Sequence, residues 1–473
     1  MSPREVYQSR EAEFSTAAEQ LRKLSDRLSM ARLTAFAGGL VVFAVLLSFS
    51  VITAFAILTA ALILFAWLVI KYETTEKSRK RFLQLAEINR LELKCLDGDF
   101  SGFKTGEEYA ERDHPYTYDL DIFGKASLFQ FLCRATSRPA SDRLAEHLKQ
   151  PAGPEEILLR QKAIAELQPL TDWRQELMTL GYMNAGAGND PGPLMQWIGS
   201  DDLFRKTGRE KVFTGCLSLL AVTAITSVIA GLPAAILAPV FVVNFIFYFT
   251  RFRRISRLQE QVSRSSDLLK GYSVIIKLIE TRNFTSPLLQ SLKSTFMEEI
   301  AASDRIRQLS KLVGRLDYRL NVLVSAPLNL LFFADIHFCL ALEKWKREHA
   351  LRIPSWFSSM AEFEALASLA NMAFNNPGWV YPQVTEDYFV FRAEDMGHPL
   401  IPANRRINNS FATEGAEKAI IVTGSNMSGK STFLRTCGVN AVLAFAGAPV
   451  CASAFTISLV RLHSSMRISD SLE

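Results

Sequence analysis

Residues 424–431 read Gly-Ser-Asn-Met-Ser-Gly-Lys-Ser, and this stretch decides how the C-terminal part of the chain is expected to fold. It fits the pattern G-x-x-x-x-G-K-[ST], in which glycines let backbone N–H groups wrap around phosphate oxygens. Lys430 can supply a positive charge to the β- and γ-phosphates, and the Ser431 hydroxyl can hold Mg²⁺. An apolar strand at 419–422 is expected to enter the loop, and a helix to leave it and run to Phe445. The sequence therefore predicts an α/β domain that binds ATP and Mg²⁺.

Hydrolysis of the nucleotide would need further residues. An acidic residue at the end of a neighbouring strand has to hold Mg²⁺, and a polar group has to align water. After Lys430 the only acidic residues are Asp470 and Glu473, and neither follows an apolar strand. No catalytic residue is identified, and the acids of a Walker B strand are missing. Either the chain is a fragment of an ATPase, or it binds nucleotide without hydrolysing it.

Two long runs of the chain, 33–70 and 212–250, contain no charged residue. A bilayer crossing takes about 20 apolar residues, so each run predicts a transmembrane hairpin, with breaks near 48–50 and at 231–233. Basic residues flank both runs, which places both ends of each hairpin in the cytoplasm and predicts an integral membrane protein with four crossings. Buried helices of a large soluble core are the alternative, but such cores rarely contain uncharged runs of this length. A third apolar run, 322–334, is too short for a crossing and predicts a buried helix.

The composition sets wide limits. A chain of 473 residues predicts two or three domains, and 49% hydrophobic with 21% charged residues excludes a disordered chain. A net charge of +5 over this length does not by itself indicate nucleic acid. The six cysteines are scattered without a C-x-x-C pair, which predicts reduced thiols and no zinc site.

The soluble segments have mainly helical patterns. Phe14, Ala17, Leu21, Leu24 and Leu28 form one apolar stripe, which predicts the packing face of a helix. The pattern predicts helices over most of 118–167 with breaks at Pro139 and 151–154, one long amphipathic helix over 258–279, and a helix ending before 375–378. Short runs at 388–391 and 419–422 predict buried strands, which places a domain boundary near Val380.

The predicted organisation has six parts. They are a cytosolic amphipathic helix (1–32), a first transmembrane hairpin (33–70), a helical segment (71–211), a second hairpin (212–250), a helical core and lever segment (251–380), and the N-terminal part of a P-loop ATPase domain (381–473).

Several of these segments resemble a known family. The runs SNMSGKSTFLRT (425–436), GVNAVLAFAGAPVCA (438–452) and RLHSSMRISDSLE (461–473) resemble the ATPase domain of MutS-type mismatch-repair proteins, and the Asn426-Met427 pair is characteristic of that loop. GHPL at 397–400 is similar to the element that opens this domain. The segments 121–151 and 360–370 resemble the start and the last helix of the family's helical core.

The resemblance implies an α-helical core and lever joined to an ABC-class ATPase domain, and a homodimer with nucleotide sites at the subunit interface. By matching positions, the residues implied to bind ATP and Mg²⁺ are Gly424, Ser425, Asn426, Met427, Ser428, Gly429, Lys430, Ser431 and Thr432, and Ile407 is implied to lie near the base. The family's function implies mismatched-DNA binding in DNA mismatch repair.

The chain departs from the family at its N-terminus. A mismatch-reading domain with a Phe-x-Glu wedge is replaced by a short helix and an apolar hairpin. Phe296-Met297-Glu298 has the letters of the wedge but lies in a helical stretch, where a core phenylalanine is expected. The end of the chain resembles a point inside the ATPase domain, which predicts a truncated chain.

Three functions follow from these features. The first is a membrane-anchored, MutS-like protein in which ATP-driven dimer closure moves a helical lever. The second is a component of an ABC-type membrane transporter, although the two hairpins offer few polar residues for a pathway. The third is a nucleotide-binding membrane scaffold without a DNA role.

Overall fold

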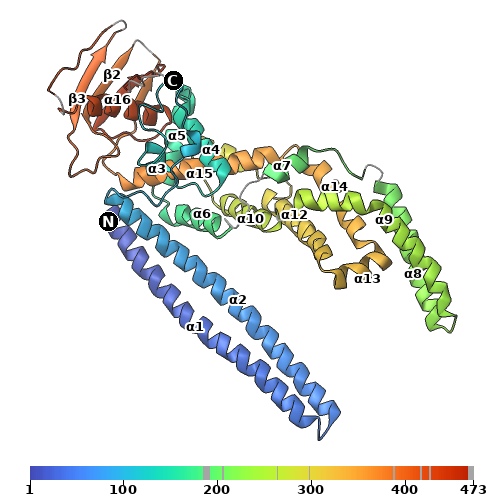
Figure 1. Cartoon of the computed structure of the whole chain (residues 1–473). Helices are drawn as coiled ribbons and strands as arrows, with labels where there is room; N and C mark the ends of the chain where they lie inside the picture. The colour runs from blue at the N-terminus through green and yellow to red at the C-terminus, as the bar shows by residue number, and fades with distance from the viewer. Residues whose placement is uncertain are drawn as a thin grey trace, which may run out of the picture. The chain divides into compact units, whose positions relative to one another are not determined.

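The computed structural model describes residues 1–184, 192–204, 207–263, 265–297, 299–386, 389–415, 418–425 and 428–466. The chain is mostly helical, with one small mixed sheet near its C-terminus (Figure 1). It divides into two compact units. Unit 1 comprises Met1–Arg134, Ala145–Met183 and Ala367–Glu473, and unit 2 comprises Ala135–Leu144 and Asn184–Leu366.

The helices of unit 1 include the two longest in the described chain. They are α1 (Pro3–Leu46), α2 (Val51–Leu96), α3 (Leu128–Leu132), α5 (Pro154–Leu167), α6 (Thr171–Asn184) and α16 (Lys430–Phe445). Residues of α4 (Arg138–Lys149) and α15 (Ile353–Asn375) are divided between the two units. Pro139, which the sequence analysis took for a break, lies in the first turn of α4, where no backbone N–H has to be donated.

The helices α1 and α2 form one antiparallel hairpin. Ser2 and Glu5 close a reciprocal cap at the start of α1, and the chain reverses at 47–50, as the sequence predicted. Three aromatic pairs fix the register: Phe14–Phe82, Phe36–Phe65 and Phe43–Phe55, with ring centroids 6.0, 5.4 and 5.3 Å apart. The cytosolic helix expected at 1–32 and the first apolar segment are therefore one continuous helix.

A polar network fixes the open end of this hairpin within unit 1. Tyr7 is fully buried and donates from its hydroxyl to Asn375 Oδ1 at 2.7 Å. Glu92, near the end of α2, accepts from Asn375 Nδ2 at 2.8 Å and from Arg134 Nη2 at 3.1 Å. Both side chains of the Glu92–Arg134 pair are at most 3% exposed. We call these four residues the root of hairpin 1.

The sheet of unit 1 has the strand order β1-β4-β2-β3. The strands are β1 (Gln383–Thr385), β2 (Val390–Met396), β3 (Asn409–Glu414) and β4 (Ala454–Ser458). The strand β4 pairs parallel with β1 and antiparallel with β2, which also pairs with β3. The helix α16 packs on this sheet, since the ring of Phe433 meets that of Phe411 on β3 at 5.7 Å.

The strand predicted at 419–422 is not formed. Residues 418–424 have no regular structure, and Ile421 is 83% exposed. A buried strand needs hydrogen-bonding neighbours at its edges, and no strand in the described ranges pairs with this segment. The strand predicted at 388–391 forms as β2 from Val390, and Tyr388 lies outside the described residues.

Unit 2 is a helical body with a second apolar hairpin. Its helices are α7 (Gly192–Gly199), α8 (Thr207–Ile229), α9 (Leu237–Val262), α10 (Ser265–Thr281), α11 (Pro287–Ser294), α12 (Ala302–Asp317), α13 (Val322–Phe332) and α14 (Ala334–His349). The single helix predicted over 258–279 is divided between α9 and α10, because Ser263 takes an extended conformation. Phe296 is fully buried, as expected of a core residue, and Glu298 lies outside the described residues.

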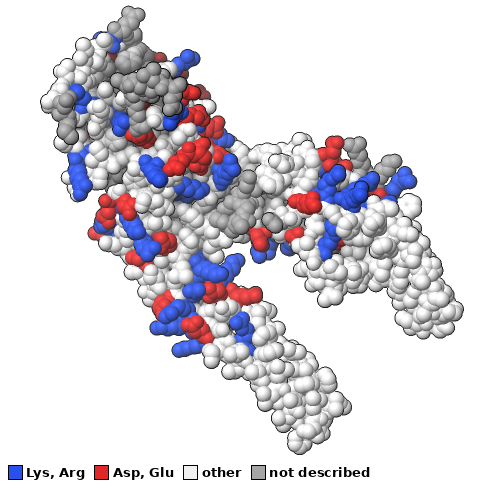
Figure 2. All heavy atoms as spheres, viewed as in Figure 1, with Lys and Arg blue, Asp and Glu red and all other residues white. Residues whose placement is uncertain are grey.

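Four helices of the described chain are long and apolar enough to cross a membrane: α1, α2, α8 and the segment 234–262 that contains α9. At most 17% of each apolar window is buried within the protein. Figure 2 shows no charged side chain on the visible face of the closed end of either hairpin. The second hairpin reverses at 230–236, around the predicted break at 231–233.

The helix predicted over 322–334 forms as α13, but the prediction that it is buried is wrong. Leu323 is 88% exposed and Val322 71%. The apolar residues predicted burial. The sequence does not distinguish a helix buried in protein from one that lies exposed beside the second hairpin.

Candidate nucleotide-binding site

The phosphate-loop motif ends where α16 begins. Gly429 precedes the helix with φ 87°, in the left-handed region that only glycine adopts at little cost. At Gly424 an added Cβ would lie 2.7 Å from Ser428 Oγ, so a larger residue would not fit without a shift. No side chain caps α16, and the first backbone N–H groups of a helix have no partner within it. Gly424 and Gly429 thus allow a tight backbone turn directly before the N-terminus of α16.

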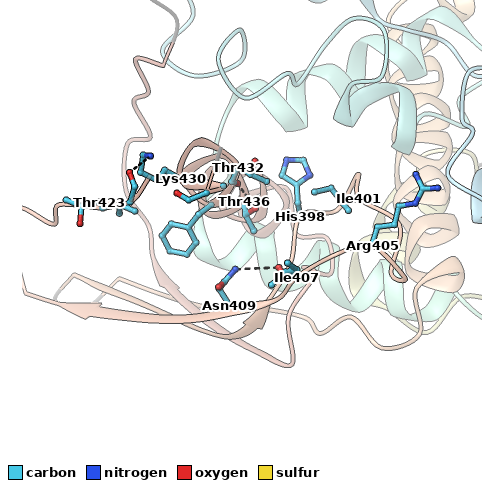
Figure 3. A pocket seen from close by; sticks show the side chains of 14 residues that line it. His398, Ile401, Arg405, Ile407, Asn409, Thr423, Lys430, Thr432 and Thr436 are labelled. Atoms are coloured by element: carbon cyan, nitrogen blue, oxygen red, sulfur yellow. Dashed lines mark hydrogen bonds between the residues drawn. The ribbon is translucent and has the colours of Figure 1, made fainter. Parts of the chain in front are cut away.

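Lys430 lies at the centre of this turn. Its ammonium donates to the carbonyl oxygen of Gly424 at 2.8 Å (Figure 3). It also donates to the carbonyl oxygen of Ser425 at 2.7 Å. Both acceptors are backbone groups of the same loop. An ammonium held in this way can exchange neutral carbonyls for charged phosphate oxygens, which are stronger acceptors.

A cavity of about 470 Å³ opens beside Lys430, within the usual size range of ligand sites. The residues that line it come from the 398–409 segment and from 422–436: His398, Ile401, Arg405, Ile407, Asn409, Val422, Thr423, Gly424, Ser428, Gly429, Lys430, Thr432, Phe433 and Thr436. Figure 3 shows Lys430 and Thr423 at one end and Ile401 and Arg405 at the other. One end thus has the lysine and the backbone turn, and the other end has apolar and basic side chains.

The structure brings six of the implied site residues to this cavity: Gly424, Ser428, Gly429, Lys430, Thr432 and Ile407. Ser425 and Ser431 are exposed and do not line it. Asn426 and Met427 lie outside the described residues. Among the described residues, no group of three or more His, Cys, Asp or Glu side chains could hold a metal ion. Mg²⁺ here would depend on Ser431 and on phosphate oxygens, which is common for this ion.

Sequence reasoning missed the second wall of the cavity. His398, Ile401, Arg405 and Asn409 lie 21 or more positions before Lys430 in the chain. The GHPL element at 397–400 was noted only as an opening segment, and the paired arginines after it were the available signal.

Asn440 ties this second wall to α16. The side chain is fully buried; its Nδ2 donates to Gly397 O at 3.0 Å, and its Oδ1 accepts from Cys451 N at 2.8 Å. Next to Gly397, burial lowers the pKa of His398 to about 4, and the positive charge of Arg435 acts in the same direction. His398 is therefore neutral at pH 7, and its Nδ1 accepts from Leu400 N at 3.3 Å.

The segment 400–407 lies between the cavity and the end of α2. On one side Ile401, Arg405 and Ile407 line the cavity. On the other side Leu400 packs against a buried cluster of Cys95, Phe100 and Phe103. Gly98 lies so close to the Pro402 ring that an added Cβ would be 2.9 Å away. We call 400–407 the shared wall, because the cavity beside Lys430 and the end of hairpin 1 both contact it.

Comparison with known proteins agrees with this geometry. Residues 420–473 match the model of MutS domain V. The DNA mismatch repair protein MutS of Caulobacter vibrioides is 28% identical over 239 residues, which cover 46% of this chain and 25% of that protein. MutS of Cereibacter sphaeroides is 28% identical over 211 residues, covering 43% and 23%.

Over these residues the chain is similar to proteins of the MutS family. A shorter match reaches 35% identity, over 132 residues of MutS from Roseobacter denitrificans, and covers 26% of this chain and 15% of that protein. The matched part of this chain thus spans a quarter or less of the length of these relatives.

Proposed function

We propose that this chain is a membrane-anchored, ATP-binding member of the MutS family, in which nucleotide at residues 424–432 changes the position of hairpin 1. The observation that carries the proposal is the shared wall. Leu400 contacts the cluster at the end of α2, while Ile401 and Ile407 line the cavity beside Lys430.

The proposed response begins at Lys430. With nucleotide present, its ammonium leaves the carbonyls of Gly424 and Ser425 and pairs with phosphate oxygens. Bound ATP with Mg²⁺ supplies the negative charge that favours this exchange. Ile407 and Ile401 then close on the base, and Leu400 shifts with them. Asn440 of α16 holds the start of the segment, because its Nδ2 donates a hydrogen bond to Gly397 O.

The lever and the dimer extend this proposal. We assign the lever role to the helical segments of the MutS core and the dimer contact to the P-loop domain. The domain organisation of the sequence analysis is retained, except that 1–32 and 33–70 form one hairpin. The relatives are named for DNA mismatch repair, and mismatched-DNA binding is proposed for this chain on that basis.

Membrane anchoring is proposed from the two hairpins. A helix pair with an exposed apolar surface this long is costly in water and stable in lipid. Basic side chains at both open ends support a cytoplasmic position for the soluble parts. Arg32 at one such end stacks over Tyr72, 4.6 Å from its ring centroid, a pair typical of the membrane interface.

Calorimetry on the full chain in detergent micelles tests nucleotide binding. Magnesium with a non-hydrolysable ATP analogue is expected to release heat with the wild type and to lose most of its affinity with Lys430→Ala. The matched control is Lys418→Ala, which removes one exposed positive charge from the segment before the loop and leaves the cavity lining intact. Equal affinity in all three proteins would refute the phosphate-loop assignment.

The DNA part needs its own measurement. Mobility shifts with matched and mismatched duplexes, with and without nucleotide, are expected to show tighter binding of the mismatch. Equal and strongly salt-dependent binding of both duplexes would remove mismatch recognition and leave only charge attraction.

A further inference from the structure

The helix α13 of unit 2 presents an apolar surface that no protein segment covers among the described residues. Leu323 is 88% exposed, Val322 71%, Phe332 45% and Leu328 40%. No charged residue occurs from 320 to 334. Contiguous exposed apolar surface on one short helix marks an interaction site.

The same helix lies against the second hairpin. Asn244 of α9 donates from Nδ2 to Leu330 O at 2.8 Å. Leu331 packs against a cluster of Ala221, Ala224 and Val240 from α8 and α9. The apolar surface of α13 therefore continues the apolar surface of hairpin 2, which is one of the two proposed membrane anchors.

This helix is too short to cross a bilayer. Its 11 residues span about 16 Å at 1.5 Å per residue, against a hydrocarbon core of about 30 Å. The following helix, α14, turns away by 83° at Phe333, whose φ of 50° lies in the left-handed region. Ile336, Leu340 and Trp345 of α14 are buried in unit 2. The two helices are therefore not one broken crossing, and α13 alone is available to lipid.

Polar groups at both ends of α13 are satisfied within the protein. Asn329 accepts from Asp335 N at 2.9 Å and donates to Ser325 O at 2.9 Å. These bonds satisfy polar groups at the bend between α13 and α14. Arg319, before the helix, pairs with Asp335 at 3.2 Å, and both side chains are at most 11% exposed. Tyr248 of α9 donates to the same carboxylate at 2.7 Å.

The Arg319–Asp335 pair bears on whether lipid can lie beside α13. Irregular backbone and charges are tolerated at membrane depth only when protein groups satisfy them. Arg319 also donates to Gln259 Oε1 at 2.9 Å and Ser256 Oγ at 3.0 Å, beyond the apolar part of α9. The network holds the start of α13 at the polar end of the hairpin, where acyl chains meet headgroups.

We propose that α13 is a third membrane-embedded element of unit 2, lying in one leaflet beside α8 and α9 with lipid acyl chains as its partner. The inference rests on the proposed anchoring by hairpin 2. It gives the helical body of unit 2, through α12 and α14 at either end of α13, a direct contact with the bilayer.

Depth-dependent quenching tests this placement on the full chain in phosphatidylcholine–phosphatidylglycerol vesicles. A Cys216→Ser parent removes the exposed cysteine of the described chain, and Leu323→Cys carries an environment-sensitive fluorophore. Its emission is expected to shift to the blue and to be quenched more by a nitroxide near the headgroup than by one deep in the acyl chain. The matched control is Leu351→Cys, because Leu351 is 97% exposed on the turn after α14 and is expected to stay unquenched in water.

A third probe separates this inference from the anchoring itself. Ile246→Cys on α9 is 57% exposed and is expected to be quenched by the deep nitroxide. Quenching at 246 with none at 323 overturns the placement of α13 and leaves hairpin 2 in the membrane. Absence of quenching at both positions overturns the anchoring as well. Equal deep quenching at 323 and 246 would contradict the single-leaflet position.

Discussion

The two apolar hairpins differ in how their open ends are fixed. In hairpin 1, helices of 44 and 46 residues continue well past the apolar run and end in the buried root, which includes Asn375 of α15. The end of α2 also packs against the shared wall. In hairpin 2, α13 packs against helices of 23 and 26 residues, and the polar contacts described here stay within unit 2. The same kind of apolar run is thus connected to the cavity beside Lys430 in one unit and is attached only locally in the other.

The largest effect is expected at the root of hairpin 1. Glu92→Ala leaves the Arg134 guanidinium buried without its carboxylate, and should lower the free energy of unfolding of unit 1 by about 3–5 kcal/mol. Denaturant titration in detergent measures this change in the free energy of unfolding. Arg90→Ala, two positions away on α2, removes an exposed pair with Glu87 and should cost less than about 1 kcal/mol. Similar losses in the two variants would mean that the root is not a rigid connection.

Leu400→Ala tests whether the shared wall transmits nucleotide binding. Removing a partly buried leucine side chain should cost about 2 kcal/mol. In the wild type, nucleotide should slow amide exchange over 89–103 and leave 251–262 unchanged, because only the first segment contacts the wall.

In Leu400→Ala that slowing should be weaker at equal nucleotide occupancy. If nucleotide protected both hairpins equally in the wild type, the contrast between them would be wrong.

The pH dependence of unit 1 should include His398. Its pKa of about 4 in the folded protein lies below the usual 6.5, so between these values the unfolded chain binds a proton that the folded chain does not. The stabilisation is complete above pH 6.5 and is lost as the pH falls toward 4, at no more than about 1.4 kcal/mol per pH unit. Denaturation at pH 7 and pH 5 should show a larger loss for the wild type than for His398→Gln. An identical loss in both proteins would assign the effect to other groups.

The smallest effect is expected at hairpin 2. Tyr248→Phe removes one hydrogen bond to Asp335, which keeps its pair with Arg319, so the cost should be about 1 kcal/mol. Thermal unfolding of the full chain in micelles measures it, with Tyr318→Phe, at 65% exposure, as the matched control. A loss as large as that of Glu92→Ala would remove the distinction between a rigid root and a local attachment.

Local pattern was sufficient for the two helix reversals and for the helix that follows the glycine-rich loop. The reversals near 48–50 and 231–233 and the helix from Lys430 to Phe445 lie where the sequence predicted them. Pattern failed where a segment depends on its neighbours. The apolar run 419–422 has the residues of a strand but no pairing partner among the described strands, and α13 has the residues of a core helix but lies exposed beside α8 and α9.

The sequence by itself determined two uncharged runs of membrane length, a glycine–lysine loop ahead of a helix, and a local similarity to MutS proteins. These properties reside in consecutive residues, since run length and backbone freedom are local. Only the tertiary structure decided that Leu400 packs against the cluster at the end of α2, that Asn440 bonds to Gly397, and that Asp335 pairs with Arg319 beside Tyr248. Such contacts join residues far apart in the chain, and their existence depends on how whole helices pack.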